Sequence, residues 1–350
     1  MNKRTRLALI YGGMGLESEI SVIGAKNLYR YVKDVFEVVP IFVDKNGVWL
    51  TKVEITKEYS ELPESSELTL AVTPINLGKR GCLISCEGEI LPIDVAFPLL
   101  HGDFGEDGSI QGSLETANIP YFGCKPAESG LCYDKIYTKI LADSLGIPTA
   151  KWISAIDTST DEARRKAESE IGYPMFVKPA RLGSSFGACP VKDSKGFESA
   201  YATAKKLGSG RVLIEKLVNV SSELECVYFK AKSKELFTKI GEIKYESDFY
   251  DYDTKYKFSS SASVIPDSVL DDDHGDKIRE YSKRLRELIG IRDLARFDFF
   301  LDSTGKILFN EINTIPGFTD KSLAPELIKS SFDDLETVLS SALSARASRN

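Results

Sequence analysis

The sequence lacks the features that mark several large classes of protein. No uninterrupted apolar run approaches the length of a membrane span, and the start, Met1 to Arg6, leads only into a short apolar segment followed by glycines. The formal net charge of −7 argues against general binding to nucleic acid or to an anionic membrane, because neither half of the chain is visibly basic. We therefore expect a soluble, cytoplasmic protein whose anionic small ligands are held by local lysines and arginines.

Signatures for zinc and for the common nucleotide loops are also missing. The cysteines have neither CxxC nor zinc-site spacing, so we expect reduced, structural thiols. They are Cys82, Cys86, Cys124, Cys132, Cys189 and Cys226. No GxxxxGK[ST] segment occurs, which excludes a P-loop protein. The glycine segment from Gly12 has Ser18 where the dinucleotide fingerprint needs its third glycine, so a nicotinamide dehydrogenase is the weakest candidate function.

A chain of 350 residues can form about two or three domains with full cores. In its first third, apolar strands alternate with helices, and one helix is expected over Glu19 to Val32 and another after Gly108. The expected strands are Arg6 to Tyr11, Phe36 to Val43 and Ile93 to Leu100. This order predicts an α/β domain over residues 1–125, with a parallel or mixed sheet that binds ligands at the carboxyl ends of its strands.

The character of the sequence changes after about residue 125. A helix is expected over Tyr133 to Leu145, with Gly146 as its stop signal. Strands expected at Met175 to Lys178 and Arg211 to Glu215 belong to a second, smaller unit, for which we predict the range 126–218. 

The remaining residues, 219–350, are expected to form a third unit. Residues 246–263 are rich in Tyr, Ser and Asp with little periodicity, which predicts a long ordered loop, and loops of this length are usually functional. An amphipathic helix is expected over His274 to Ile289.

Two strand-like segments in this third unit predict a hairpin. They are Ala295 to Leu301 and Ile307 to Asn313, joined by the turn-forming residues Asp302 to Lys306. A turn centred on Thr304-Gly305 without a bulge fixes which residues of the two strands face each other.

This register pairs Asp298 with Glu311 and Arg296 with Asn313, and it projects all four side chains from one face. Facing carboxylates repel each other unless a cation lies between them, and oxygen-only ligands suit Mg²⁺. The alternative is a salt-bridged sheet face on which Arg296 neutralises the acids.

A second candidate site is the loop from Lys178 to Gly187. A strand delivers Lys178, and Gly183 and Gly187 flank the hydroxyl groups of Ser184 and Ser185. The backbone N–H groups of such a loop can line a phosphate site. The alternative is that the loop is only a hairpin turn.

Six ordered motifs resemble those of the ATP-grasp carboxylate–amine ligases, and of the D-alanine–D-alanine ligase family in particular. They are Leu100 to Gly112, Lys178 to Gly187, Leu213 to Val218, Phe249 to Tyr256, the Asp298/Glu311/Asn313 hairpin, and Asn310 to Thr319. The similarity runs from about residue 6 to residue 330. It implies a Rossmann-like N-terminal domain followed by a two-part ATP-grasp domain, whose two parts are the second and third units.

The resemblance also implies the ligands of the two ATP-grasp parts. ATP would lie between them, with Lys135, Lys178 and Lys255 near its phosphates and Glu223 at the ribose. The nucleotide-binding set is Lys135, Lys178, Ser185, Glu215, Lys216, Leu217, Val218, Glu223 and Lys255. Asp298, Glu311 and Asn313 would carry a pair of Mg²⁺ ions, for which Mn²⁺ can substitute.

The implied reaction joins two D-alanines for peptidoglycan synthesis. The carboxylate of the first attacks the γ-phosphate of ATP to give an acyl phosphate, and the amine of the second then displaces phosphate. By similarity, Arg296 and the backbone N–H of Gly317 stabilise the oxyanion, and Ser322 and Leu323 border the second D-alanine.

Four further residues acquire roles near the first D-alanine. Glu17 matches the family carboxylate that pairs with its ammonium, and Ser184 and Tyr256 match hydroxyls that link to this carboxylate and help to close the loops. His101 lies near the same substrate in the family. Without the resemblance, Glu17 would be a helix-start acid favoured by the dipole, Ser184 a turn residue, Tyr256 a packing aromatic and His101 a loop histidine.

The sequence departs from the family pattern at Ser18, Phe186 and Asp320-Lys321, which affects subsite details. Tyr256 favours an amine nucleophile over a hydroxy acid, but a D-alanine–D-serine ligase keeps a similar tyrosine and remains an alternative. A non-catalytic nucleotide-binding regulator is a second alternative, against which the intact metal ligands and Arg296 argue. A homodimer is expected because the family is usually dimeric.

Overall fold

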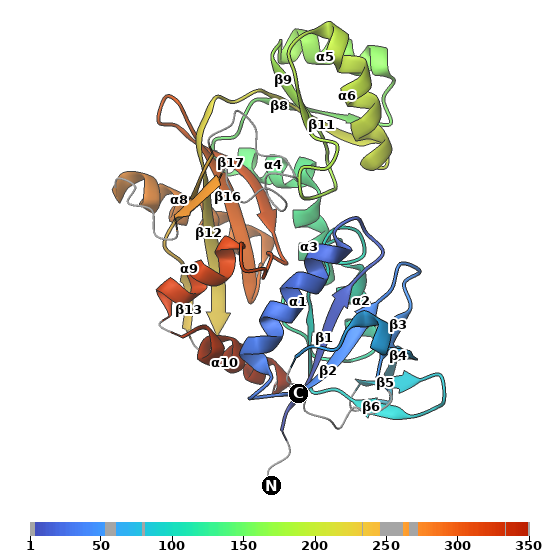
Figure 1. Cartoon of the computed structure of the whole chain (residues 1–350). Coiled ribbons are helices and arrows are strands. Elements are labelled where there is room, and N and C mark those ends of the chain that lie inside the picture. The colour runs from blue at the N-terminus through green and yellow to red at the C-terminus, as the bar shows by residue number, and fades with distance from the viewer. Residues whose placement is uncertain are drawn as a thin grey trace.

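The computed structural model describes residues 4–52, 61–78, 81–232, 234–245, 262–265, 272–332 and 334–348. These residues form three sheets with helices packed on them, so the predicted α/β class is confirmed (Figure 1). Figure 1 shows the first sheet in blue beside the third in yellow to red, while the second, in yellow-green, projects away from the first. Among the helices of the described ranges, none combines the length and apolar character that a membrane crossing needs.

The first sheet has the strand order β6-β5-β4-β3-β2-β1-β7. Its strands are β1 Arg6–Gly12, β2 Glu37–Val43, β3 Trp49–Thr51, β4 Leu70–Asn76, β5 Gly81–Ser85, β6 Ile90–Pro92 and β7 Val95–Pro98, with a 3-10 turn at Ser65–Glu67. Strand β1 is parallel to β2 and β7, whereas the other pairs are antiparallel, so of the two predicted alternatives, a parallel or a mixed sheet, the mixed sheet is the one found. Strand β7 is shorter than the expected Ile93 to Leu100.

The alternating side chains of β1 build a core on each face of this sheet. Leu7 and Leu9 pack with helix α1 (Ser18–Val32), whereas Ala8 and Ile10 pack with helix α2 (Ser109–Thr116). Because every residue of β1 beyond Arg6 is buried, the strand reads as a continuous apolar run, as expected for a strand covered on both faces.

The second sheet has the order β10-β9-β11-β8 with antiparallel pairing. Its strands are β8 Trp152–Ile156, β9 Met175–Pro179, β10 Cys189–Val191 and β11 Arg211–Lys216, and its helices are α5 Thr160–Glu170 and α6 Ser194–Leu207. Phe197 and Tyr201, both fully buried on α6, lie in a core with the apolar residues of β9 and β11. 

The third sheet has the order β15-β14-β12-β16-β17, with β13 paired to β12. Its strands are β12 Val220–Ala231, β13 Lys234–Phe237, β14 Gly241–Tyr245, β15 Ala262–Ile265, β16 Leu294–Asp302 and β17 Ile307–Asn313. The helices around it are α3 Pro126–Tyr133, α4 Lys135–Ser144, α8 Asp272–Ile289, α9 Leu323–Ser331 and α10 Leu335–Ala347. Both α3 and α4 contact β17.

Two sequence-based expectations need correction here. The helix predicted over about Tyr133 to Leu145 is α4, but it begins two residues later than expected, because Asp134 has an extended backbone (φ −91°, ψ 106°) that ends α3 and begins α4. The loop predicted over 246–263 ends too late, since residues 262 and 263 belong to β15 and pair with β14. The rest of that loop, with Lys255 and Tyr256, lies outside the described residues.

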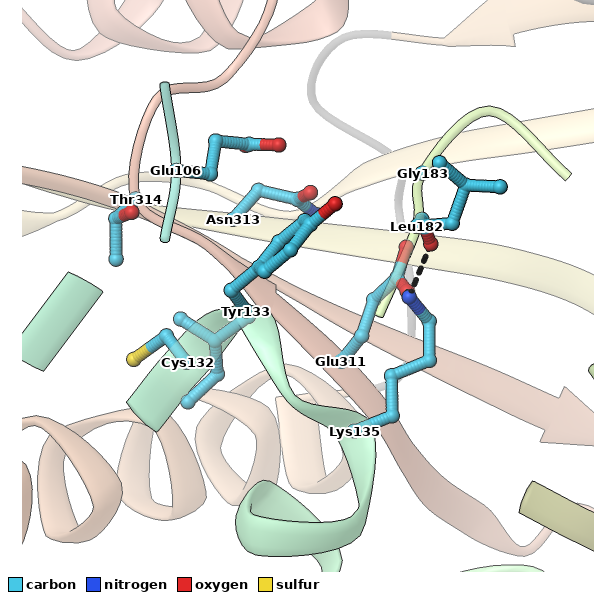
Figure 2. A pocket seen from close by; sticks show the side chains of 10 residues that line it. Glu106, Cys132, Tyr133, Lys135, Leu182, Gly183, Glu311, Asn313 and Thr314 are labelled. Carbon is cyan, nitrogen blue, oxygen red and sulfur yellow. Dashed lines mark hydrogen bonds and ion pairs between the residues drawn. The ribbon is translucent and has the colours of Figure 1, made fainter. Parts of the chain in front are cut away.

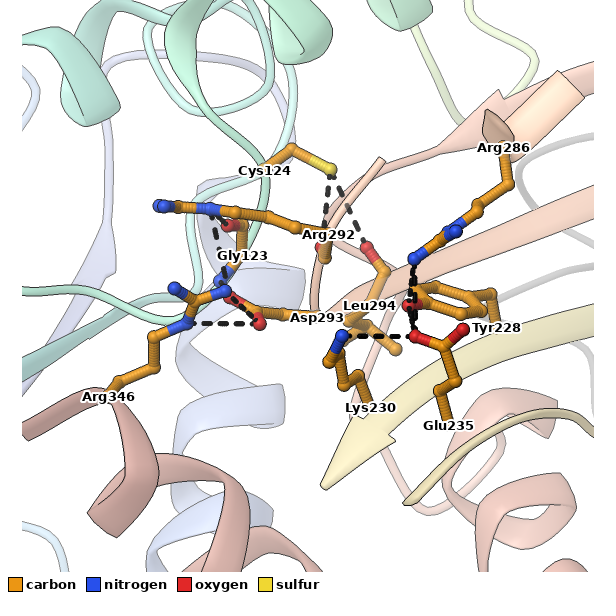
Figure 3. A network of polar contacts seen from close by, with 10 residues as sticks. All are labelled: Gly123, Cys124, Tyr228, Lys230, Glu235, Arg286, Arg292, Asp293, Leu294 and Arg346. Atoms are coloured by element: carbon orange, nitrogen blue, oxygen red, sulfur yellow. Dashed lines mark hydrogen bonds and ion pairs between the residues drawn. The ribbon is translucent and has the colours of Figure 1, made fainter. Parts of the chain in front are cut away.

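The first and third sheets share one hydrophobic core. Helix α10 contacts α1, β7 and β12, so it joins elements of both sheets, and Phe318 stacks edge-on against Phe97 of β7 at 5.7 Å between ring centroids. Beside this core, Asp293 accepts hydrogen bonds from the backbone N–H of Gly123 (3.1 Å) and from Arg346 Nε of α10 (3.0 Å), as Figure 3 shows. These contacts predict that the two units unfold together.

We expect Leu339→Ala in α10 to lower the free energy of unfolding by about 2–5 kcal/mol, because this side chain is 0% exposed in the shared core. With Trp152→Phe in the background, Trp49 of the first sheet becomes the only tryptophan and reports the unfolding of that sheet. Urea unfolding followed by fluorescence should give a lower midpoint for the Leu339→Ala variant.

The matched control is Leu288→Ala on α8, where the side chain is 51% exposed and the change should stay within about 0.5 kcal/mol. An unchanged Trp49 transition in a folded Leu339→Ala variant would mean that the units unfold independently.

Candidate active site

The β16–β17 hairpin carries the predicted metal ligands in the predicted pairing. Asp298 faces Glu311, and Arg296 faces Asn313. The assumption of a bulge-free hairpin is wrong, because the register shifts after Asp298 and leaves Asn310 as an extra residue. Near the turn, the pairing register is shifted by one residue from the assumed one, since Asp302 pairs with Lys306 (3.0 Å). The bulge then restores the expected register at the site.

Cations already contact both carboxylates of this face. Arg296 forms two bonds with Asp298, Nε to Oδ1 at 2.7 Å and Nη2 to Oδ2 at 2.6 Å, and Asn313 Nδ2 donates to Asp298 Oδ2 at 2.9 Å. Lys135 Nζ lies 3.1 Å from Glu311 Oε2. The alternative reading of a salt-bridged face thus describes Asp298 in this arrangement.

A further acid continues this row on β12. Glu225 pairs with Asp298 across the sheet, is buried, and lies 3.3 Å from Arg296 Nε. Burial lowers the pKa of Arg296, but the carboxylates of Asp298 and Glu225 outweigh it and raise that pKa well above its usual value. Sequence reasoning missed Glu225, although its position two residues after Glu223 on one strand signals a shared face.

The donor set on this face fits a divalent cation. Asp298, Glu311 and Asn313 offer only oxygen ligands on adjacent strands, which is the chemistry that Mg²⁺ prefers. Across the described ranges of the chain, no cluster of three or more His, Cys, Asp and Glu side chains forms a complete metal site. The remaining ligands of a bound ion would therefore come from phosphate oxygens and water, as is usual for Mg²⁺.

Glu17 lies opposite the tip of the loop that follows Lys178. Its side chain is 6% exposed, does not cap helix α1, and accepts a short hydrogen bond from Ser184 Oγ. Glycines approach this carboxylate closely on both sides, because a Cβ at Gly102 would lie 2.9 Å from Glu17 Oε2 and one at Gly183 would lie 3.0 Å from Oε1. Glu17 is thus directed into the site, which its reading as a simple helix-start acid does not explain.

The loop itself joins the antiparallel strands β9 and β10, so it is a hairpin connection, and its phosphate-binding role stays a prediction. Ser184 and Ser185 both have left-handed backbones, with φ of 51° and 58°. Such conformations cost energy for residues other than glycine and are found mainly at functional sites.

Lys178 and Glu215 form the centre of a buried charge cluster. Lys178 Nζ lies 2.6 Å from Glu215 Oε2 and donates to Asn310 Oδ1 at 3.1 Å. Lys139, which is 0% exposed, lies 2.7 Å from Glu215 Oε1. Burial raises the pKa of Glu215, but Lys139 and Lys178 outweigh it and lower that pKa to about 2. Sequence reasoning missed Lys139, whose spacing of one helical turn from Lys135 was its only signal.

The other predicted nucleotide residues follow on β11 and β12. Lys216 Nζ donates to the backbone oxygens of Gly172 (3.2 Å) and Tyr173 (2.9 Å). Leu217 and Val218 are half-buried between the strands, and Glu223 is half-buried on β12. 

The residues predicted near the amino acids lie at the carboxyl end of β7 and before α9. His101 is 8% exposed and hydrogen bonds with the backbone of Ile315, and burial lowers its pKa to about 4. Gly317 lies against Ser322, since a Cβ there would be 2.7 Å from Ser322 Oγ, and this hydroxyl accepts from Thr319 N at 3.0 Å. The side chain of Leu323 is buried in the shared core, so only its backbone can border a ligand.

A pocket brings several of these groups together (Figure 2). It is lined by Glu106, Cys132, Tyr133, Lys135, Leu182, Gly183, Glu311, Ile312, Asn313 and Thr314. Figure 2 shows Lys135 pointing to Leu182, whose backbone oxygen accepts a hydrogen bond from the Lys135 ammonium at 2.7 Å. Glu106 was part of a recognised motif but had no predicted role. Burial and the negative charge of Glu17 raise the pKa of Glu106 to about 8.

We expect the contribution of Glu106 to the free energy of unfolding to fall as the pH rises from about 4.5 to about 8, because native Glu106 keeps a proton that the unfolded chain loses. Glu106→Gln removes this proton and keeps an acceptor for Gly102 N–H. Relative to the wild type, the variant should gain more than about 1 kcal/mol between pH 5 and pH 8.

Urea unfolding at several pH values, with chelator present, measures this difference. Glu17 and Glu311 favour the proton and Lys135 opposes it, so their charges are part of the measured effect. Exposed Glu87→Gln controls for the loss of one acidic group. Parallel pH dependence of wild type and Glu106→Gln would contradict the assignment.

Comparison with known proteins gives the family. The models "D-ala D-ala ligase N-terminus" and "D-ala D-ala ligase C-terminus" match residues 6–124 and 141–343. A D-alanine–D-alanine ligase of Caldicellulosiruptor bescii is 35% identical, over 93% of this chain and 90% of that protein.

Solved structures agree with this result. The D-alanyl-alanine synthetase A of Vibrio cholerae matches with a TM-score of 0.84 and 29% identity, covering 99% of both chains. The VanG D-Ala:D-Ser ligase of Enterococcus faecalis matches with a TM-score of 0.82 and 28% identity, covering 98% of this chain and 100% of that one. The fold is therefore the predicted ATP-grasp fold, and the chain belongs to the D-alanine–D-alanine ligase family.

Proposed function

We propose that the protein ligates two D-alanines to D-alanyl-D-alanine at the expense of ATP, for peptidoglycan synthesis. The observation that carries the proposal is the link between Ser184 and Glu17, which joins the loop after Lys178 to the start of α1. The same loop approaches the hairpin face that carries the proposed metal ligands, because Lys135 contacts both Leu182 of the loop and Glu311 of the hairpin. An amino-acid ammonium and a nucleotide phosphate therefore have binding groups within one pocket.

The nucleotide is proposed to bind between the second and third sheets. Lys135 and Lys178 would contact its phosphates, Glu215 to Val218 would border the adenine and Glu223 the ribose, with Ser185 donating from the loop. Lys255 has the same proposed role at the γ-phosphate. The support is the ion pair between Lys178 and Glu215, which holds the Lys178 ammonium beside a buried carboxylate near the carboxyl end of β11.

In the proposed reaction, Glu17 binds the ammonium of the first D-alanine, with His101 nearby. The carboxylate of this substrate attacks the γ-phosphate, and ADP leaves. The amine of the second D-alanine, bordered by Ser322 and Leu323, then attacks the acyl phosphate and displaces phosphate. Arg296 and the N–H of Gly317 would stabilise the oxyanion, and Ser184 and Tyr256 would help to close the site.

Asp298, Glu311 and Asn313 would hold the divalent cation, which on binding neutralises phosphate charge that otherwise repels the attacking carboxylate. A pair of Mg²⁺ ions is our proposal for its number and identity. We also propose a cytoplasmic homodimer, and a chain divided into units at residues 1–125, 126–218 and 219–350. Light scattering after size exclusion tests the dimer.

The direct test is phosphate release from ATP and Mg²⁺ with a panel of D-amino and D-hydroxy acids. D-Alanine should give the highest rate, with one dipeptide formed per phosphate as measured by mass spectrometry. Preference for D-serine as the second substrate would instead assign a D-alanine–D-serine ligase, the activity named for the similar VanG enzyme of Enterococcus faecalis. ATP binding without D-alanine-dependent turnover would indicate a regulator instead.

We expect Glu311→Gln to lower kcat roughly 100-fold or more, because it removes a charged metal ligand from the hairpin while keeping its size. The variant should fold, since Glu311 is 19% exposed at the side chain and keeps a neutral acceptor for Lys135. Steady-state phosphate release measures the loss, with exposed Glu336→Gln as the control. A folded variant with normal turnover refutes the metal assignment.

Glu17→Gln should raise the KM for the first D-alanine about tenfold or more, because a charge-assisted contact to the ammonium is lost. The KM for ATP should change less than about twofold, since the lost contact is to the amino acid. The matched control is Glu19→Gln, an exposed acid in the first turn of the same helix. Equal changes in both KM values, or similar effects of Glu17→Gln and Glu19→Gln, would mean that Glu17 is only an acid at the start of the helix.

A further inference from the structure

Asp134 is a fully buried carboxylate outside the groups used so far. It is 0% exposed and lies between helices α3 and α4, immediately before Lys135. Its Oδ1 accepts the backbone N–H of Ile136 at 3.0 Å, so it caps the N-terminus of α4. Lys135 is the first residue of that helix, so the cap fixes the backbone position of Lys135.

The other oxygen of Asp134 holds two arginines. Oδ2 accepts from Arg181 Nε at 2.9 Å and from Arg211 Nε at 2.7 Å. Arg181 belongs to the loop after Lys178, and Arg211 begins strand β11. One carboxylate thus joins the start of helix α4, the loop after Lys178 and the start of strand β11.

Backbone contacts follow the same path. Asp134 and Arg181 form an isolated antiparallel bridge, and the N–H of Lys135 donates to the oxygen of Ala180 at 2.9 Å. The ammonium of Lys135 then reaches Leu182 O at 2.7 Å and Glu311 at 3.1 Å. The position of Lys135 relative to the loop is consequently fixed both by its backbone N–H and by its ammonium group.

A buried ion triad of this kind is a weak source of net stability, because desolvation offsets the attraction between the charges. Its more consistent effect is to fix geometry. We propose that Asp134 is a positioning residue for nucleotide binding, which keeps Lys135 and the loop from Lys178 to Gly187 in a common frame. This inference rests on the proposed function, in which Lys135 and the loop contact the phosphates of ATP.

The test compares Asp134→Asn with Asp143→Asn, an exposed aspartate near the other end of α4. The asparagine keeps the size and the cap, but it brings an amide and no charge to two guanidinium groups. Since a misplacement of about 1 Å can cost on the order of 100-fold, we expect the Kd and KM for ATP to rise roughly tenfold or more. The KM for D-alanine should change less than the KM for ATP, because Glu17 lies on α1 and contacts this loop at Ser184 rather than at Arg181.

Calorimetric titration with ATP and Mg²⁺ gives the Kd, and phosphate release gives the KM values. Asp143→Asn should match the wild type. A folded Asp134→Asn variant with a wild-type Kd for ATP, or with equal changes for ATP and D-alanine, overturns the inference. Should Asp134→Asn not fold, Arg181→Gln decides, because this side chain is 44% exposed and the variant should fold.

Arg181→Gln is expected to weaken ATP binding about threefold or more, since it removes one of the two cations from Asp134. An unchanged Kd for ATP in this variant also overturns the inference. The proposed function is judged separately, by D-alanine-dependent phosphate release in the wild type. Its failure there leaves the ATP titrations of the variants as an independent measurement of the role of Asp134.

Discussion

Two lysines one turn apart on α4 connect the second sheet to the third, and the site depends on them. Lys139 is fully buried against Glu215 of β11, whereas Lys135 contacts Glu311 of β17. An unpaired Lys139 in such surroundings would cost several kcal/mol, so α4 is best accommodated where this lysine meets Glu215. Assembly of the units and formation of the pocket are therefore one process. The helix joins two sheets that otherwise have separate cores.

The hairpin shows how far local sequence rules reach. Strand propensity and turn residues predicted both strands and the pairing of Asp298 with Glu311, which the structure confirms. The prediction was right at the site although the turn and the bulge were not anticipated, because a shift at the turn is cancelled by the extra residue Asn310. A bulge depends on packing of both strands, which no local pattern records. The bulge also has a structural consequence, since the side-chain oxygen of the extra residue Asn310 accepts a hydrogen bond from Lys178.

Contacts between distant segments account for most of what the sequence did not predict. Lys139 and Glu106 carried no motif role, and their importance follows from burial beside Glu215 and Glu17, which only the assembled fold determines. The same holds for α10, whose apolar face joins cores of the first and third sheets. Resemblance to a family suggested the residues that we propose to touch ligands, because the types of such residues are chemically constrained. It gave no information on the residues that place them.

The site combines the rigid β16–β17 hairpin with the strained loop after Lys178. Asp298 and Glu311 lie on a ladder of backbone hydrogen bonds, which fixes them without help from a ligand. Ser184 and Ser185 lie in left-handed conformations that cost on the order of 1–3 kcal/mol each, so the loop needs contacts that hold it there. The bond from Ser184 to Glu17 and that from Arg181 to Asp134 supply two such contacts from opposite sides. A ligand that bridges Glu17 and Lys135 would add a third, so binding energy can complete the order of this loop.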